Sequence, residues 1–125
     1  MTKIFIAFAA ILAGLSVAAG AFASHTLKEK ITDRALEIFQ TGAQYQMYHA
    51  LALLLVALLL SQAQSSQMSL TASGFAFITG IVIFSGSLYA LSLTGIKWLG
   101  AIAPIGGFAF LIGWACLAIA AWGYK

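Results

Sequence analysis

The chain has 125 residues, of which 62% are hydrophobic and 7% charged, whereas an average soluble domain carries about 25% charged residues. A soluble protein of this size could not keep so much apolar surface away from water, so the composition predicts an integral membrane protein. The net charge of +3 indicates no basic surface for nucleic acid, because the Lys and Arg residues between Lys28 and Glu37 are interleaved with Asp and Glu.

The first apolar segment covers residues 4–23 and gives about 30 Å of helix, enough to cross the hydrocarbon of a bilayer. It also resembles a signal peptide, because Lys3 precedes it and Ala21-Phe22-Ala23 forms an A-x-A-like cleavage site. The segment is longer than the roughly 7 to 15 apolar residues of a usual signal peptide. We therefore expect an uncleaved first transmembrane helix.

Residues 24–42 form the only substantial polar connection. Thr32 or Asp33 is a suitable N-cap, and apolar residues then recur among charged ones, as on a helix that lies at a membrane surface. The pattern predicts a short interfacial amphipathic helix over about residues 32–42. It is also typical of a solvated charged face that leads into the second span.

Three further apolar segments follow, over about residues 43–60, 70–93 and 98–122. An uncharged polar linker separates the first two of them, and a tight turn separates the last two. Trp98 and Trp122 are roughly 36 Å apart along a helix, which places one indole at each membrane interface. Each of these segments is long enough to span a bilayer.

Small residues recur at spacings of three and four along three of the four segments. Such residues let helix backbones approach closely in lipid, where hydrophobicity cannot drive association, and their spacing implies a left-handed crossing at about +20°. We therefore predict an all-α integral membrane protein, with one domain over residues 1–125 folded as a four-helix transmembrane bundle. The residues expected at helix contacts are Ala7, Ala10, Gly14, Ala21, Ser73, Ala76, Gly80, Ser87, Ala90, Thr94, Gly106, Ala109, Gly113, Cys116 and Ala120.

The basic residues are divided unevenly between the two ends of this bundle. Four Lys or Arg residues fall in the connections after the first and third spans, against two near the chain termini. Because cytoplasmic loops carry an excess of Lys and Arg, this count favours a topology with both termini outside the cytoplasm.

Candidate functional residues concentrate where the second apolar segment begins. There Gln44-Tyr45-Gln46-Met47-Tyr48-His49 runs without a break into an apolar run. Polar groups at such a depth are costly unless they face protein, water or a ligand, which makes this stretch the default site. Together with a histidine at the end of the first span, the candidate ligand-binding residues are Gln44, Tyr45, Gln46, Tyr48, His49 and His25.

The two histidines have two interpretations. If the second helix begins near Ala43, His25 and His49 lie toward the same face of the membrane, where two histidines on adjacent helices could ligate one haem iron or another metal. Alternatively, His49 hydrogen-bonds Tyr45 or a backbone carbonyl, and His25 caps the first helix. The second interpretation is favoured, so we expect neither a metal nor a cofactor.

The face formed by Tyr45, Gln46 and His49 has two interpretations as well, because these residues are three and four apart on a helix. Turned inward, it could bind the polar head of a quinone or lipid, or it could join helices through hydrogen bonds worth about 1 kcal/mol each. Tyr45 and Tyr48 are also typical of an aromatic belt that anchors a helix at the membrane interface.

Four motifs resemble those of a known family. They are Gly20-Ala21-Phe22-Ala23-Ser24-His25, Tyr45-Gln46-Met47-Tyr48-His49-Ala50-Leu51-Ala52-Leu53-Leu54, Ser85-Gly86-Ser87-Leu88-Tyr89-Ala90-Leu91, and Pro104-Ile105-Gly106-Gly107 with Trp114. In combination they are similar to the YgdD/YwdK-type family of small four-span membrane proteins, although Ala23-Ser24 stands where the family pattern has Gly-Ala. The resemblance covers nearly the whole chain. It implies the four-helix fold and a multi-pass protein of the bacterial cell (inner) membrane, and it brings no substrate, cofactor or catalytic residue.

Several residue types and motifs that particular functions require do not occur in the sequence. No Asp, Glu, Lys or Arg lies between Gln40 and Ile96, so the chain lacks an acidic relay for proton pumping and a charged ring for ion selection. No catalytic triad or phosphate loop occurs, and the lone Cys116 allows no CxxC metal or redox site. We expect a non-enzymatic structural or accessory component that associates with itself or with a larger membrane complex. The alternatives are a lipid-, quinone- or haem-binding module and a small transporter or channel subunit.

Overall fold

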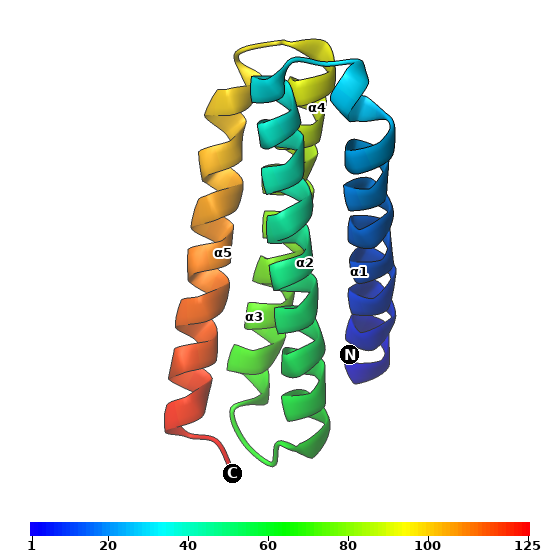
Figure 1. Ribbon diagram of the computed structural model, residues 1–125. Coiled ribbons are helices and arrows are strands. Elements are labelled where there is room, and N and C mark those ends of the chain that lie inside the picture. Colours follow the sequence, from blue (N-terminus) through cyan, green and yellow to red (C-terminus); the bar gives the residue numbers. More distant parts are fainter.

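The computed structural model describes residues 1–125 and contains helices and no strands. Four rods stand side by side, because α3 and α4 are joined end to end by a π-helical turn (Figure 1). Each rod is long and apolar enough to cross a membrane, which confirms the predicted all-α, four-span fold. The elements are α1 (Thr2–His25), a 3₁₀ helix (Leu27–Glu29), α2 (Asp33–Gln62), α3 (Gln67–Gly80), the π turn (Ile81–Ser85), α4 (Gly86–Thr94) and α5 (Leu99–Trp122).

The second span begins ten residues earlier than the predicted Ala43, because residues 32–42 are continuous with α2. Thr32 caps this helix, and its side-chain oxygen accepts a hydrogen bond from the backbone N–H of Ala35 at 3.1 Å. The side chain of Phe39 packs against Ala23 and Leu27 in a small buried cluster that is separate from the main hydrophobic core. This packing keeps the charged segment within α2, so residues 32–42 are its first turns and not a separate interfacial helix.

Helix α2 is the central rod of the bundle. It packs against α1 along one side and against α3, the π turn and α4 along another, while α5 packs against the α3–α4 rod. Both termini lie at one end of the bundle, and the α1–α2 and α4–α5 connections lie at the other (Figure 1). The basic residues of the two connections therefore share one end, as the topology prediction assumes.

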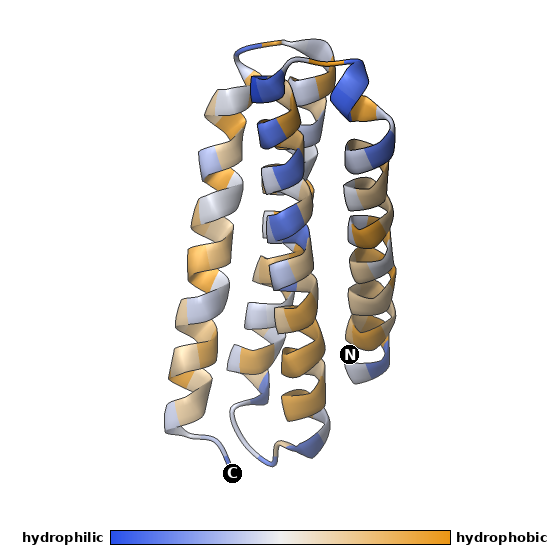
Figure 2. Ribbon diagram, viewed as in Figure 1, coloured by the Kyte–Doolittle hydropathy of each residue, from blue (hydrophilic) through white to orange (hydrophobic).

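The hydrophobic core lies in the half of the bundle nearer the termini. Its fully enclosed members include Phe5 from α1, Leu53 and Val56 from α2, and Leu70 and Phe77 from α3, each 0% exposed. In Figure 2 the lower half of α2 is hydrophobic down to its last turn, whereas hydrophilic residues recur down its upper half. The polar part of α2 is thus confined to the half that approaches the charged connections.

Small residues bring α5 close to the α3–α4 rod, as the sequence predicts. A Cβ atom at Gly106 would lie 2.3 Å from the backbone nitrogen of Phe84, and one at Gly113 would lie 2.6 Å from the ring of Phe77. Real Cβ atoms do not approach so closely, so only glycine permits this helix spacing at both positions.

In α1 the predicted contact face is wrong, because its small residues face away from the bundle. Ala7, Ala10, Gly14 and Ala21 are exposed, and a Cβ atom at Gly14 would meet no atom within 4 Å. The buried residues of α1 are instead Phe5, Ala9, Ser16 and Ala23, which recur at spacings of four and seven. Both stripes have helical periodicity, so spacing alone could not tell which one faces α2.

Candidate functional site

Gln46 joins three helices near the middle of the bundle. Its Nε2 donates to the carbonyl of Leu12 in α1 at 2.7 Å, and its Oε1 accepts from the hydroxyl of Tyr89 in α4 at 2.7 Å. Only 5% of the residue is exposed. Both ends of the side-chain amide are therefore occupied within the chain, and Gln46 acts as a cross-link between α1, α2 and α4.

His49 occupies an aromatic site between α2 and α5. The indole N–H of Trp114 donates to its Nε2 at 3.1 Å, and its Nδ1 lies 2.8 Å from the carbonyl of Tyr45. An indole N–H can only donate, so Nε2 is the acceptor and Nδ1 carries the proton that is donated to Tyr45. The imidazole also stacks on Phe110, with ring centroids 3.6 Å apart and ring planes 8° from parallel.

Three buried serines add further bonds between helices. Ser16 in α1 donates to the carbonyl of Ala43 at 2.6 Å, Ser85 to Gly42 at 2.7 Å, and Ser73 in α3 to Gly113 at 2.8 Å. No buried side-chain nitrogen or oxygen lacks a hydrogen-bond partner. The side chains of Gln46, His49 and the three serines, which form the polar layer of the bundle, therefore need no ligand to satisfy their hydrogen bonds. In lipid this matters, because an unpaired polar group costs several kcal/mol.

The polar layer lies near the midplane of the bundle. Tyr48 is the sixteenth of the 30 residues of α2, and Phe110, which stacks on His49, is the twelfth of the 24 residues of α5. An aromatic belt at the end of a span would lie about 15 Å from the midplane. The interpretation of Tyr45 and Tyr48 as such a belt is therefore wrong.

His25 and His49 are far apart along the bundle axis. The bond from Gln46 to Leu12 and the bond from Ser16 to Ala43 align α1 antiparallel to α2, which brings His49 opposite the region of Ala9. His25 lies a further sixteen residues along α1, or about 24 Å. The two histidines therefore cannot ligate one iron or metal. The earlier start of α2 explains the error, because it moves His49 about 15 Å deeper than the sequence suggested.

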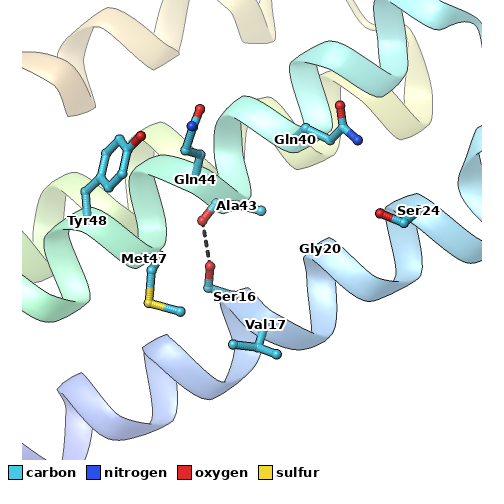
Figure 3. A pocket seen from close by; sticks show the side chains of 9 residues that line it. All are labelled: Ser16, Val17, Gly20, Ser24, Gln40, Ala43, Gln44, Met47 and Tyr48. Atoms are coloured by element: carbon cyan, nitrogen blue, oxygen red, sulfur yellow. Dashed lines mark hydrogen bonds between the residues drawn. The ribbon is translucent and has the colours of Figure 1, made fainter.

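Gln44 and Tyr48 lie in a different place, at the rim of a groove between α1 and α2. The groove has a volume of about 490 Å³. In Figure 3, Ser16, Gly20 and Ser24 lie on its α1 side, Met47 extends from α2 toward α1, and the side chains of Gln44 and Tyr48 extend outward from α2. The residues that line it are Ser16, Val17, Gly20, Ser24, Gln40, Ala43, Gln44, Met47 and Tyr48. Both Gln44 and Tyr48 are exposed.

Five of the six candidate residues thus occupy three places, and Tyr45 lies in none of them. Gln46 and His49 are buried in the bundle, Gln44 and Tyr48 line the groove, and His25 ends α1 at the exposed rim. Tyr45 is 38% exposed, and its ring lies 4.9 Å from that of Phe84 and 5.6 Å from that of Tyr48.

The sequence prediction missed the partners of these residues. Ser16, Tyr89 and Trp114 supply or receive the bonds described above, and Gln40 and Ser24 complete the groove. Three of these residues, Ser24, Tyr89 and Trp114, belong to the motifs that carry the family resemblance. That membership was the one signal in the sequence that pointed to them.

Comparison with known proteins agrees with this architecture. Residues 19–107 match the family described as "Protein of unknown function (DUF423)". The chain is 50% identical over 119 residues to the UPF0382 membrane protein YwdK of Bacillus subtilis (strain 168), covering 95% of this chain and 96% of the relative. It is also 44% identical over 118 residues to the UPF0382 membrane protein SAB0533 of Staphylococcus aureus (strain bovine RF122 / ET3-1), covering 94% of each chain.

No solved structure matches the chain. The family match covers well over half of the sequence, and the relatives align along nearly all of it. Both relatives are named as membrane proteins, in agreement with the four apolar helices. The chain therefore belongs to the DUF423 family of membrane proteins, as the motifs of its four spans suggested.

Proposed function

We propose that this protein is an accessory component of an assembly in the bacterial cell (inner) membrane, and that α1 joins it to a transmembrane helix of another chain. The observation that carries this proposal is the outer face of α1, defined as Ala7, Ala10, Gly14 and Ala21. All four residues are exposed, although small residues at this spacing are typical of close helix contacts in lipid.

The bundle itself supports this interpretation of small residues. Gly106 and Gly113 in α5 allow close contact with Phe84 and Phe77 of the α3–α4 rod. The outer face of α1 offers the same kind of surface, but a Cβ atom at Gly14 meets nothing within 4 Å. A helix of another chain could approach Gly14 as closely as α5 approaches α3.

The interior supports a structural role rather than chemistry. Gln46, His49 and the buried serines all use their polar atoms in bonds between or within helices, and none is left unpaired. These bonds stabilise one arrangement of helices in the membrane. A bundle that exposes a face of small residues on α1 is suited to assembly with other membrane proteins.

Native mass spectrometry of the protein extracted gently from its own membrane tests this proposal. We expect a mass larger than one chain, and we expect Gly14→Leu to remove the additional mass. Gly86→Leu is the matched control, because a Cβ atom at Gly86 also meets no atom within 4 Å, and it should leave the assembly intact.

Two results would overturn the proposal. One is a wild-type protein that runs as a single chain, and the other is an assembly that survives Gly14→Leu unchanged. If additional mass is present, multiples of this chain identify self-association, whereas a different mass identifies a larger complex.

A further inference from the structure

The groove between α1 and α2 contains polar side chains that nothing in the chain satisfies. Gln40, Gln44 and Tyr48 follow one another at four-residue spacing along the exposed side of α2, and Ser24 lies across from them on α1. Ser16, in contrast, donates its hydroxyl proton to the carbonyl of Ala43, a bond that Figure 3 shows between α1 and α2. The side chains of the other four make no hydrogen bond in the structure.

The depth of these groups makes their lack of partners unusual. Tyr48 lies at the middle of α2, and Gln44 and Gln40 lie about 6 Å and 12 Å from it toward the charged end. The hydrocarbon extends about 15 Å on each side of the midplane. Gln44 is therefore well inside the hydrocarbon, where an exposed amide has no water to bind and is costly without a partner.

The groove has room for such a partner. Its volume of about 490 Å³ falls within the roughly 300–1,000 Å³ that is usual for small-molecule sites. Gly20 forms part of the α1 side, and a Cβ atom there would meet nothing within 4 Å. Apolar contacts come from Val17 and Met47. The groove thus combines a column of hydrogen-bonding groups with apolar walls.

The chemistry of the lining indicates an uncharged ligand. No Asp, Glu, Lys or Arg lines the groove, so it offers no counter-charge for a phosphate or an ammonium group. The glutamine amides and the tyrosine hydroxyl each donate and accept hydrogen bonds, which suits carbonyl or hydroxyl oxygens. Phospholipid phosphates lie at the bilayer surface, well above Gln44.

We propose that this groove binds the uncharged carbonyl- or hydroxyl-bearing head of a membrane-dissolved amphiphile, which enters laterally between α1 and α2 and hydrogen-bonds Gln44. The apolar tail of the ligand remains in the lipid beside the groove. The site is distinct from the outer face of α1 and from the face of Tyr45, Gln46 and His49, where the protein occupies the polar side-chain atoms of Gln46 and His49.

Two probes distinguish a head group with carbonyl oxygens from one with a hydroxyl. The full-length protein in phospholipid nanodiscs is titrated separately with decylubiquinone, which carries carbonyl oxygens, and with dioctanoylglycerol, which carries a hydroxyl. Native mass spectrometry measures the fraction of protein that retains one bound molecule. Saturable binding of either probe supports the proposal and identifies which head group the site prefers.

Variants of the residues that line the groove test whether the probe binds there. Gln44→Leu removes the central amide, and Gly20→Leu fills open space without removing a polar group, so each should weaken binding by about tenfold or more. Gln62→Leu is the matched control, because Gln62 is an exposed glutamine on the same helix outside the groove. It should bind the probe like the wild type. Circular dichroism and a single monodisperse peak verify that each variant is folded.

Three results would overturn the proposal. The first is a wild-type protein that retains neither probe, and the second is binding that Gln44→Leu and Gly20→Leu leave unchanged. The third is a photocrosslink from position 44 to a helix of another chain in the native membrane, which would make the groove a protein contact.

Discussion

The indole N–H of Trp114 in α5 donates a hydrogen bond to Nε2 of His49 in α2, 3.1 Å away, near the middle of the bundle. This bond fixes the imidazole tautomer and links two helices whose backbones are held apart by aromatic rings, among them Phe77 and Phe110. A histidine in such a place acts as part of the packing. It leaves no ring nitrogen for a haem or metal.

Replacing Trp114 by Phe should destabilise the bundle by about 1–2 kcal/mol, because it leaves Nε2 of His49 without a donor in a buried position. The free energy of unfolding in detergent micelles, measured by titration with a denaturing detergent, checks this value. Trp122→Phe is the control, since Trp122 is 95% exposed and should change little. Equal stabilities of the two variants would contradict the structural role of the bond.

Gln46 and Tyr89 should be energetically coupled. Gln46→Leu removes the amide that joins α1 and α4, and Tyr89→Phe removes the hydroxyl that donates to its Oε1. Bonds of this kind in membrane proteins average about 0.6 kcal/mol and reach about 1.7. A double-mutant cycle on the unfolding free energy should give a coupling in that range. Strict additivity of the two changes would show that the bond contributes no stability.

The N-cap of α2 can be tested separately. Thr32→Ala removes the side-chain oxygen that accepts from Ala35 and should lower stability by about 1 kcal/mol. Thr32→Ser keeps an acceptor oxygen and should recover most of the loss. If residues 32–42 were a separate surface helix, this cap would have little effect on the bundle, so no change in stability would contradict a continuous α2.

The four-helix fold could be predicted because each span has enough apolar residues to cross a bilayer, whatever its partners are. The start of α2 could not, because Arg34 and Glu37 are exposed on the same turns that bury Phe39. A charged helix end and a surface helix have the same pattern in one dimension. Only contact with Ala23 and Leu27 distinguishes them.

The candidate site, too, could be predicted only in part, because a local sequence pattern does not show which helix each side chain faces. The stretch from Gln44 to His49 was identified by its depth, but its residues point in different directions around α2. Bonds such as those from Gln46 to Leu12 and from Trp114 to His49 join residues 34 and 65 positions apart. They depend on the register between helices, which no local pattern specifies.

Two adjacent glycines in α5 test whether a backbone contact sets the distance between α5 and the α3–α4 rod. A Cβ atom at Gly106 would lie 2.3 Å from the backbone nitrogen and 2.7 Å from the Cα of Phe84, whereas one at Gly107 would lie 3.9 Å from that residue's ring. A backbone atom of the π turn cannot move aside as a flexible side chain can. Gly106→Ala must therefore push α5 away from the α3–α4 rod, and overpacking of this kind typically costs about 1–3 kcal/mol.

Gly107→Ala differs by one position and adds the same methyl group at an ordinary contact distance, so its unfolding free energy should stay within about 0.5 kcal/mol of the wild type. It should even be slightly more stable if the lower helix propensity of glycine matters here. Comparable losses in both variants would contradict this contact, because helix propensity favours alanine at both positions. A loss confined to Gly106→Ala would show that the backbone contact between α5 and the π turn sets the spacing of the bundle.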